Sequence, residues 1–321
     1  MPTKLMRNYE NNISYLDKMR VYTSKLIKLG SIKRQISMVK YISNFWDYYL
    51  IRLGFLKSCV INFRDNENIE FSNDKLLDLF DLRFITILRK EGFSVSKIKN
   101  KFLVRSDNIK FIANNISELS VILENFIENQ YDWLDAKDKK VVDIGANIGD
   151  TAVYFSKVKK AKKVIAFEPY PYSYNIAKKN IILNKLKNVV ILNQGVGNKE
   201  TFIRIKGGFV NTGSSDLKSF DSGKKIKIVT LKDIVKKYKI ENDILKMDCE
   251  GCEYSIILNA DKETLRSFDQ IMIECHYGYK NIERKLKETG FEVSHSKVHY
   301  SYNKSAENPV MYINLVKAKL I

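Results

Sequence analysis

The feature that most constrains the fold of this chain is the segment of residues 139–150, which reads Lys-Lys-Val-Val-Asp-Ile-Gly-Ala-Asn-Ile-Gly-Asp. Its β-branched residues are typical of a buried strand, and two glycines, Gly145 and Gly149, follow at once. Glycine allows the backbone to approach a ligand closely, because no Cβ stands in the way. Asp150 and the amphipathic residues after it predict a helix that Asp150 caps. The segment therefore predicts a strand, a tight turn and a helix N-terminus.

From about residue 138 onward, apolar strand patterns alternate with amphipathic helix patterns. Such alternation is typical of a mostly parallel sheet with helices on both faces. Strands are expected near residues 141–144, 164–168, 189–193, 244–248, 270–274, 292–298 and 311–316. The last two are close enough to form an antiparallel hairpin. The sequence therefore predicts an α/β fold with a Rossmann-like, doubly wound, mostly parallel seven-stranded sheet.

An acidic residue, Glu168, ends the second expected strand, 25 residues after Asp143. A carboxylate at this place can accept hydrogen bonds from both hydroxyls of a ribose. The first turn departs from the dinucleotide pattern G-x-G-x-x-G, because Asn147 stands at the second glycine and would crowd a pyrophosphate. Together, this turn and the strand-ending Glu-Pro pair resemble the S-adenosylmethionine site of Rossmann-like methyltransferases.

Three further motifs narrow the resemblance. Residues 245–253 read Leu-Lys-Met-Asp-Cys-Glu-Gly-Cys-Glu, residues 273–276 read Ile-Glu-Cys-His, and residues 126–131 read Phe-Ile-Glu-Asn-Gln-Tyr. Taken in their order along the chain, over roughly residues 124–316, these motifs resemble the FkbM family of methyltransferases. The resemblance implies a class I methyltransferase domain over residues 126–321. It also implies transfer of a methyl group from S-adenosylmethionine to an oxygen, often a sugar or polyketide hydroxyl.

Ligands of a doubly wound sheet bind beyond the carboxyl ends of its strands. The turn after the first strand is therefore expected at the amino-acid end of S-adenosylmethionine, the end of the second strand at the ribose, and the end of the third beside the adenine. The expected cofactor-binding residues are Asp143, Gly145, Asn147, Gly149, Glu168, Pro169, Asn193, Gln194 and Gly195. Gly195 replaces the alanine that the family usually has.

Acidic residues and a histidine follow the fourth and fifth expected strands, where the transferred methyl group should lie. His276 is the first candidate for the base that accepts the proton of the acceptor hydroxyl, because its ordinary pKa is near neutrality. Asp248 is the second candidate, either as base or as ligand of a divalent cation, and Glu250 joins the predicted catalytic group. Glu253 either belongs to this group or caps the next helix. No metal site is assigned.

Four cysteines are too few and too scattered for the disulfide framework of a small secreted protein. Cys249 and Cys252 form a C-x-x-C pattern, and with Cys275 and His276 a zinc site is conceivable. The alternative is that these cysteines fill positions for small apolar side chains. The second interpretation is preferred, because one C-x-x-C without a second pair is weak evidence for zinc.

Residues 1–125 are expected to form a mainly helical accessory region with a small β-hairpin at residues 102–104 and 109–112. One helix is expected over residues 39–53 and another from about residue 72 to Gly92. The chain has a net charge of +18, and its first 60 residues hold eleven basic against three acidic residues. This region is expected to recognise or position the acceptor, which is predicted to be a small molecule or glycan.

The long connection of residues 206–225 is expected to be an acceptor-side loop. No apolar stretch is long enough for a membrane span and no secretory signal is recognisable, so a cytoplasmic location is expected, with peripheral membrane contact left open. Two other functions stay open: an RNA methyltransferase that uses the basic N-terminal region, and a non-catalytic module that binds S-adenosylmethionine.

Overall fold

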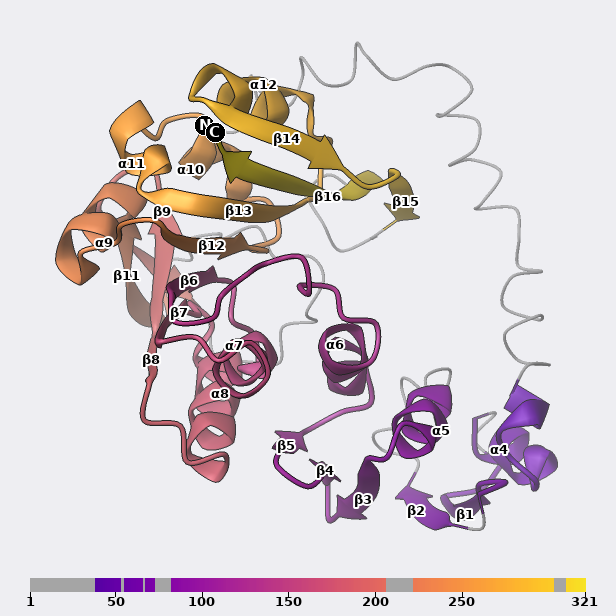
Figure 1. The fold of residues 1–321 in the computed structure, drawn as a ribbon. Coiled ribbons are helices and arrows are strands. Elements are labelled where there is room, and N and C mark those ends of the chain that lie inside the picture. The colour runs from indigo at the N-terminus through magenta and orange to yellow at the C-terminus, as the bar shows by residue number, and fades with distance from the viewer. Residues whose placement is uncertain (1–37, 53–54, 66, 73–81, 206–221, 303–309) are drawn as a thin grey trace. The chain divides into compact units, whose positions relative to one another are not determined.

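A computed structural model describes residues 38–52, 55–65, 67–72, 82–205, 222–302 and 310–321 (Figure 1). The chain divides into two compact units, with the boundary between Gln130 and Tyr131. Among the described helices, none is both long and apolar enough to cross a membrane.

The N-terminal unit combines short helices with two small antiparallel sheets. Its elements are η1 (Met38–Lys40), α4 (Phe45–Arg52), β1 (Ser58–Asn62), β2 (Asn68–Ser72), α5 (Leu82–Lys90), β3 (Ser94–Ile98), β4 (Lys101–Arg105), β5 (Lys110–Ala113) and α6 (Ser117–Phe126). The predicted hairpin is confirmed as β4 and β5, and β3 extends it to three strands. The hairpin of β1 and β2 was not predicted, so the described part holds more strand than a mainly helical region would. The helix expected over residues 39–53 is confirmed only as α4, with η1 before it. Of the helix expected from about residue 72 to Gly92, α5 is described, and residues 73–81 lie outside the described residues.

The second unit is built on the predicted central sheet. Its strands lie in the order β14-β16-β13-β12-β6-β7-β8, with β15 paired to β16. Neighbours among β13, β12, β6, β7 and β8 are parallel, whereas β16 is antiparallel to β13 and β14. The bounds are β6 (Lys140–Ile144), β7 (Lys163–Phe167), β8 (Val189–Leu192), β12 (Asp243–Met247), β13 (Phe268–Cys275), β14 (Phe291–His295), β15 (His299–Tyr302) and β16 (Val310–Leu320). The α/β fold class and the antiparallel closing hairpin are therefore confirmed.

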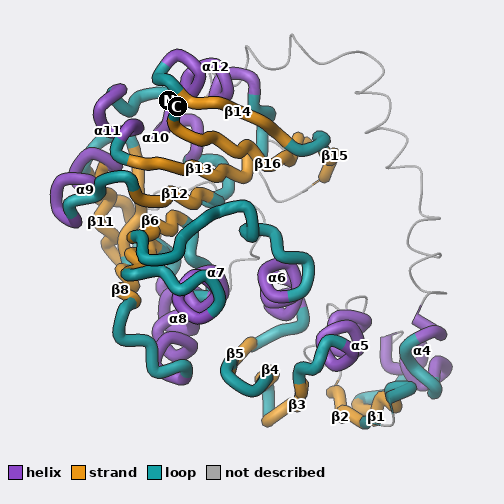
Figure 2. The backbone as a smooth tube through the Cα atoms, in the orientation of Figure 1, coloured by secondary structure: helices purple, strands orange, loops and turns teal. Residues whose placement is uncertain are grey.

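The strand order also explains why the sheet is covered on both faces. From β6 the chain steps outward through β7 to β8, and from β12 it steps the other way to β13. Because parallel crossovers are right-handed, this reversal places the two sets of helices on opposite faces. The first set is α7 (Asp150–Lys157) and α8 (Pro171–Leu183), and the second is α10 (Glu253–Ile257), α11 (Lys262–Arg266) and α12 (Lys280–Glu288) (Figure 2). The direction reverses between β6 and β12, which is where such folds bind ligands.

The first residue of α8 agrees with the prediction from the sequence, whereas the first residue of α7 does not. Proline opens α8 as predicted, and Asn180 within it donates a hydrogen bond to Ile148 O at 2.9 Å, tying α8 to the first turn. The predicted cap of α7 is wrong. Gly149, at φ +82°, holds the N-cap position, and Asp150 is the first helical residue, with its side chain buried.

A second, three-stranded sheet was not predicted. It consists of β9 (Gln194–Gly197), β10 (Thr201–Ile205) and β11 (Lys224–Thr230), and α9 (Leu231–Tyr238) follows it. The strand expected at residues 189–193 ends at Leu192, and Asn193 forms the bend into β9. Most of the expected acceptor-side loop, residues 206–221, lies outside the described residues.

Candidate active site

The carboxyl ends of four parallel strands meet at the reversal point of the sheet. We call the ends of β6 and β7 the Glu168 side, and the ends of β12 and β13 the His276 side. The two sides touch at Gly145, which has φ +85°. A Cβ added to Gly145 would lie 1.7 Å from the backbone oxygen of Asp248, so only glycine fits this crossing. Gly145 is thus required by the close approach of two chain segments.

A buried ion pair links β6 to β12 beneath this crossing. Asp143 and Lys246 are paired in register, and Lys246 Nζ lies 3.0 Å from Asp143 Oδ1 with both side chains at most 1 % exposed. Thr151 Oγ1 donates to Asp143 Oδ2 at 2.6 Å, and Lys246 Nζ donates to Gly145 O at 2.9 Å. The expected contact of Asp143 with the cofactor is therefore replaced by a structural role, because its carboxylate is enclosed by these partners.

Glu168 follows β7 and its side chain is buried. Its carboxylate accepts hydrogen bonds from the backbone N–H of Asn147 at 2.9 Å and of Tyr170 at 2.8 Å. Burial raises the pKa of Glu168 to about 8, although these two hydrogen bonds favour the ionised form. Each carboxylate oxygen has two lone pairs and uses one of them here, so both oxygens can still accept a hydrogen bond from a ligand.

The rest of the first turn is shaped around Glu168 and α8. Asn147 has φ +45°, a left-handed conformation that aims its N–H at Glu168. A Cβ added to Gly149 would lie 3.1 Å from the Cα and Cβ atoms of Ala177, so this glycine allows α7 and α8 to pack closely. The turn residues that were predicted to bind the cofactor therefore lie close together. Among them, Gly149 allows α7 to pack against α8, and Asn147 donates a hydrogen bond to Glu168.

Asn193 supports the loop that carries Glu168. Its Nδ2 donates to the backbone oxygens of Glu168 and Pro169, each at 2.9 Å, while its Oδ1 accepts from Lys224 Nζ at 2.7 Å. Asn193 and Pro169 therefore form one hydrogen-bonded unit next to Glu168. Asn193 therefore holds in place the loop that follows β7 and carries Glu168.

Gln194 and Gly195 begin β9 immediately after that bend. They pair in parallel with Lys227 and Ile228 of β11. Gly195 is buried and Gln194 is half-buried. Both therefore follow the end of β8, as expected, within a strand that leads into the second sheet. Their contact with an adenine ring stays a prediction.

On the His276 side, four carboxylates surround one buried imidazole. Nδ1 of His276 lies 3.1 Å from Glu253 Oε1. Nε2 lies 3.3 Å from Glu250 Oε2, 3.7 Å from Asp248 Oδ1 and 3.9 Å from Glu274 Oε1. The predicted catalytic residues Asp248, Glu250 and His276 are thus brought together, and Glu253 and Glu274 join them.

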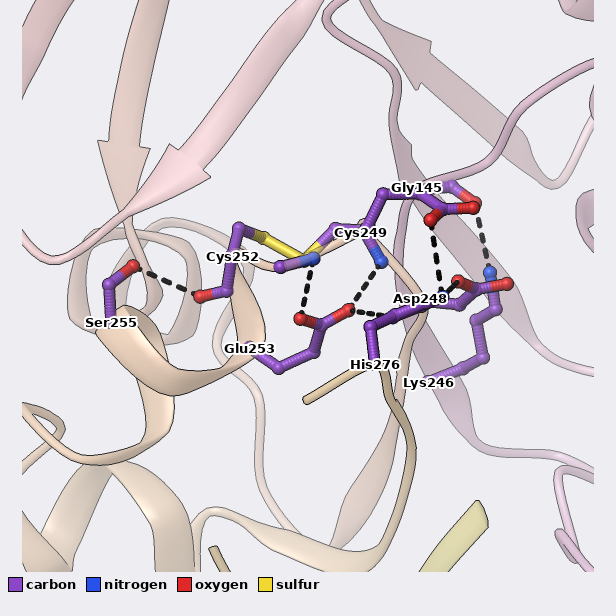
Figure 3. Close-up of a disulfide and its surroundings, with 10 residues drawn as sticks. Gly145, Lys246, Asp248, Cys249, Cys252, Glu253, Ser255 and His276 are labelled. Carbon is purple, nitrogen blue, oxygen red and sulfur yellow. Dashed lines mark hydrogen bonds and ion pairs between the residues drawn. A yellow bond between two sulfur atoms is a disulfide. The ribbon is translucent and has the colours of Figure 1, made fainter. Parts of the chain in front are cut away.

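Glu253 organises the loop between β12 and α10. It is fully buried, and it accepts hydrogen bonds from Cys249 N at 3.0 Å and Gly251 N at 2.8 Å while it holds His276 (Figure 3). Its carboxylate therefore binds the preceding loop, and the N-cap position of α10 belongs to Cys252. The helix-capping interpretation of Glu253 is replaced by a role in shaping the His276 side.

The cysteine predictions need correction. Cys249 and Cys252 form a disulfide, with 5.5 Å between their Cα atoms (Figure 3). Sulfurs bonded to one another do not serve as thiolate ligands, so the conceivable zinc site is not formed. Cys275 is buried as a small apolar side chain, and burial, with the nearby carboxylates, raises its thiol pKa well above the usual value.

Comparison with known proteins agrees with this geometry. A family model described as Methyltransferase FkbM domain matches residues 143–293, which hold both sides of the site. Residues 143–293 thus match the FkbM methyltransferase domain. Two fungal relatives are similar to the chain. Methyltransferase sdnD of Sordaria araneosa is 23 % identical over 238 residues, which cover 62 % of this chain and 92 % of that protein. Methyltransferase 1 of Beauveria bassiana (strain ARSEF 2860) is 24 % identical over 196 residues, which cover 53 % and 79 %.

Among solved structures, the FkbM methyltransferase of Methylobacillus flagellatus KT aligns with 74 % of this chain and 59 % of its own, at 14 % identity and a TM-score of 0.38. The family match identifies the chain as a methyltransferase that uses S-adenosylmethionine. The predicted enzyme class and cofactor are therefore confirmed.

The protonation state of His276 in the FkbM domain differs from the expectation of a neutral base. Burial alone would lower the pKa of His276, but the carboxylates of Glu250, Glu253 and Asp248 outweigh it and raise the pKa well above the ordinary value. The carboxylates around the ring therefore favour its protonated form. A ring that already holds its proton cannot accept one from an acceptor hydroxyl.

Lys246 lies at the reversal point of the sheet, where it pairs with Asp143, and this pairing was not predicted from the sequence. The sequence does indicate that Lys246 is unusual, because it lies among the apolar residues Ile244, Leu245 and Met247 of a strand that is buried on both faces. A lysine in such a strand requires an acidic partner. Burial would lower the pKa of Lys246, but Asp143 and other carboxylates raise it, so the amine stays charged.

Proposed function

We propose that this FkbM domain transfers the methyl group of S-adenosylmethionine to a hydroxyl group of a sugar or glycan. The observation that carries the proposal is the group of carboxylates around His276 at the ends of β12 and β13. A sugar hydroxyl is a weak nucleophile until its proton has an acceptor. Carboxylates directly across the strand ends from Glu168 meet that requirement.

For the cofactor, Glu168 is proposed to bind the ribose hydroxyls through the two oxygens that already hold Asn147 N and Tyr170 N. The turn at Gly145 and Asn147 is proposed to border the amino-acid end, and Gln194 with Gly195 to border the adenine. Asp143 is left out of these contacts, because it is fully buried against Lys246. The methyl group would then point toward the His276 side.

The proposed reaction is an in-line displacement. The acceptor oxygen forms a bond to the methyl carbon, the bond from carbon to sulfur breaks, and sulfur keeps the electron pair as S-adenosylhomocysteine leaves. The hydroxyl proton passes to Asp248 or Glu250, whose side chains are 29 % and 28 % exposed and so can reach a bound acceptor. Holding oxygen and methyl in line supplies a large part of the rate. His276, fixed by Glu253, is proposed to position these carboxylates.

The test is a transfer assay with S-adenosylmethionine labelled on its methyl group. The full chain is incubated with separate glycan, lipid and RNA fractions, and with Asp248→Asn as the matched inactive variant. Label on a glycan oxygen that depends on Asp248 supports the proposal. Label on an RNA base would favour the alternative RNA methyltransferase, and cofactor binding without transfer to any fraction would favour a non-catalytic module.

The N-terminal unit is proposed to position the acceptor. The support is indirect: the matched residues 143–293 and the proposed cofactor contacts all lie in the second unit. Exchange of basic for neutral residues in the first 60 residues is expected to change acceptor affinity and leave cofactor affinity unaltered, which calorimetry with S-adenosylhomocysteine measures.

A further inference from the structure

The disulfide between Cys249 and Cys252 encloses the turn that carries one of the proposed catalytic carboxylates. Only two residues lie between the cysteines, and the first of them is Glu250. The carboxylate of Glu250 places Oε2 3.3 Å from Nε2 of His276. A change in the conformation of this turn therefore moves a group that is proposed to accept the proton of the acceptor hydroxyl.

The turn holds a residue in an unfavourable backbone conformation. Glu250 has φ +58°, and Gly251 after it has φ +116°. The left-handed region suits glycine but is disfavoured for a residue with a Cβ, because the Cβ crowds the following carbonyl oxygen. Such a residue keeps this conformation only where the surrounding structure fixes it. Glu250 is therefore expected to leave it when the restraints on the turn are released.

Two kinds of restraint hold the turn. Glu253 accepts hydrogen bonds from Cys249 N at 3.0 Å and Gly251 N at 2.8 Å, so it fixes the backbone on both sides of Glu250. The disulfide adds a covalent restraint, since it keeps the two cysteine Cα atoms 5.5 Å apart (Figure 3). Backbone hydrogen bonds of a short segment open and close by local fluctuation, whereas a covalent bond does not. Cleavage of the disulfide therefore leaves the turn with only the weaker restraint.

The disulfide lies where a reductant can reach it. Cys249 and Cys252 are both half-buried, in contrast to Cys275, which is buried. Accessible disulfides exchange with thiols more readily than enclosed ones, and they are the labile and regulatory ones. The bond closes a loop of only four residues, so it restrains the unfolded chain less than a bond across a long loop does. Reduction can therefore alter the turn while the rest of the unit stays folded.

We propose that this disulfide is a redox-sensitive positioning element for methyl transfer. In the oxidised protein it holds Glu250 beside His276, and reduction to two thiols releases the turn and lowers turnover. This inference rests on the proposed transfer to a hydroxyl and adds a means of regulation to the same site. The Glu168 side should be unaffected, because Glu168 is held by the N–H groups of Asn147 and Tyr170, which belong to other segments.

The switching step is an exchange between the disulfide and a dithiol. One thiolate of the dithiol attacks a sulfur of the disulfide, which breaks the bond between Cys249 and Cys252 and forms a mixed disulfide. The second thiol of the dithiol then displaces the protein sulfur and closes its own disulfide. The protein gains two electrons and two protons and ends with two thiols, while the dithiol is oxidised. An excess of a small disulfide, such as oxidised glutathione, reverses the step.

The expected loss of turnover is partial, because the other proposed proton acceptor has a separate anchor. Asp248 N donates to Ile144 O at 3.0 Å, and this bond ties Asp248 to the end of β6 independently of the disulfide. A group misplaced by about 1 Å can cost about 10²-fold in rate. With Glu250 displaced and Asp248 retained, we expect kcat to fall about tenfold. Affinity for S-adenosylhomocysteine should stay within about twofold.

The first measurement is hydrogen–deuterium exchange of the full chain in dithiothreitol and in oxidised glutathione, read by mass spectrometry. The amides of Cys249 and Gly251 should exchange about tenfold faster in the reduced protein, while residues 243–247 of β12 should not change. The double variant Cys249→Ser/Cys252→Ser should exchange fast in both conditions. The matched control is Cys59→Ser, which removes a free cysteine and keeps the disulfide. Thiol alkylation counts the reduced cysteines, and binding of S-adenosylhomocysteine checks that each protein is folded.

The second measurement is the labelled transfer assay in the same two conditions. The wild type and Cys59→Ser should lose turnover on reduction and regain it on reoxidation, whereas the double variant should keep the lower rate in both. Faster exchange and lower turnover that reverse only where both cysteines are present support the proposal. It is overturned if the exchange of the turn, or turnover, is the same in both redox states. It is equally overturned if dithiothreitol leaves the disulfide of the folded protein intact.

The two measurements also separate this proposal from the proposed function. Transfer to a glycan hydroxyl that does not depend on the redox state removes the switch and leaves the function. Redox-dependent transfer to an RNA base removes the function and leaves the switch. The exchange measurement requires no acceptor, so it tests the release of the turn whichever fraction takes up the label.

Discussion

The Glu168 side and the His276 side present buried carboxylates at the ends of parallel strands, but in different electrostatic settings. On the Glu168 side, Asp143 has its own lysine, and Glu168 has two backbone N–H groups. On the His276 side, four carboxylates share one imidazole. On the first side each carboxylate has its own fixed partners, whereas on the second side several carboxylates gather around the same ring.

This difference separates two tasks at one sheet edge. A binding site with fixed hydrogen bonds suits a cofactor that binds in every catalytic cycle, and Asn147 and Glu168 already form such a bond. A group that must receive a proton has to hold negative charge ready next to the acceptor. We therefore expect changes on the Glu168 side to alter cofactor affinity, and changes on the His276 side to alter turnover.

The largest effect is expected at Gly145, where the two sides touch. Gly145→Ala would place a Cβ 1.7 Å from Asp248 O, and should lower the free energy of unfolding by roughly 3–5 kcal/mol. Gly92→Ala is the control, because Gly92 has the same φ of +85° with no atom within 4 Å of the added Cβ. Its cost should be only about 1–2 kcal/mol. Denaturant unfolding measures both, and equal costs would contradict the close crossing.

The next effect is a loss of turnover on the His276 side. Asp248→Asn removes a carboxylate that is proposed to accept the proton of the acceptor hydroxyl, so kcat should fall about 10²–10⁴-fold. Affinity for S-adenosylhomocysteine should stay within about twofold, since the interaction is made in the transition state. Steady-state kinetics and calorimetry measure the two quantities, and the control is Glu292→Gln, which changes an exposed carboxylate on β14. A fully active Asp248→Asn enzyme would remove the proposed division.

The disulfide gives a smaller effect on the same side. Cys249 and Cys252 close a loop of four residues, so the double change to serine should cost about 2 kcal/mol of stability. A reductant should destabilise the wild type by the same amount and leave the double variant unchanged. Cys59 and Cys275 are present in both proteins, so they do not account for a difference. Wild-type unfolding that is insensitive to the reductant would argue against the disulfide.

The smallest effect is the pH dependence of cofactor binding on the Glu168 side. With a pKa raised to about 8, Glu168 must release a proton before it accepts two ribose hydroxyls, so affinity should rise about tenfold from pH 7 to pH 9. In the cofactor-free protein the same raised pKa stabilises the fold fully below about pH 4.5, and this stability is lost as the pH rises through 8. Calorimetry in buffers of different ionisation enthalpy counts the released proton. A pH profile that Glu168→Gln leaves unchanged would exclude Glu168.

Much of the second unit follows from the sequence because its strands are short, apolar and end in polar residues. The expected strands at residues 141–144 and 244–248 match β6 and β12 within one residue, and the acidic residues that follow lie where a parallel sheet gathers strand ends. Asp248, Glu250 and His276 could therefore be predicted as neighbours.

Their roles could not, because these depend on register and burial. The pairing of Asp143 with Lys246 requires that the two residues lie opposite one another on β6 and β12. The state of His276 depends on carboxylates from two chain segments at once. The bond between Cys249 and Cys252 depends on a loop conformation that the C-x-x-C spacing permits but does not require.

The most direct test of the two-sided site is calorimetric binding of S-adenosylhomocysteine to Glu168→Ala and Asp248→Asn, measured side by side with the wild type. Loss of a charged hydrogen bond predicts that Glu168→Ala weakens affinity by about 10–100-fold, while its thermal unfolding stays cooperative. Asp248→Asn should bind like the wild type and fail in turnover. Unchanged affinity in Glu168→Ala, or equal loss of affinity in both variants, would contradict the division of the sheet edge into a cofactor side and an acceptor side.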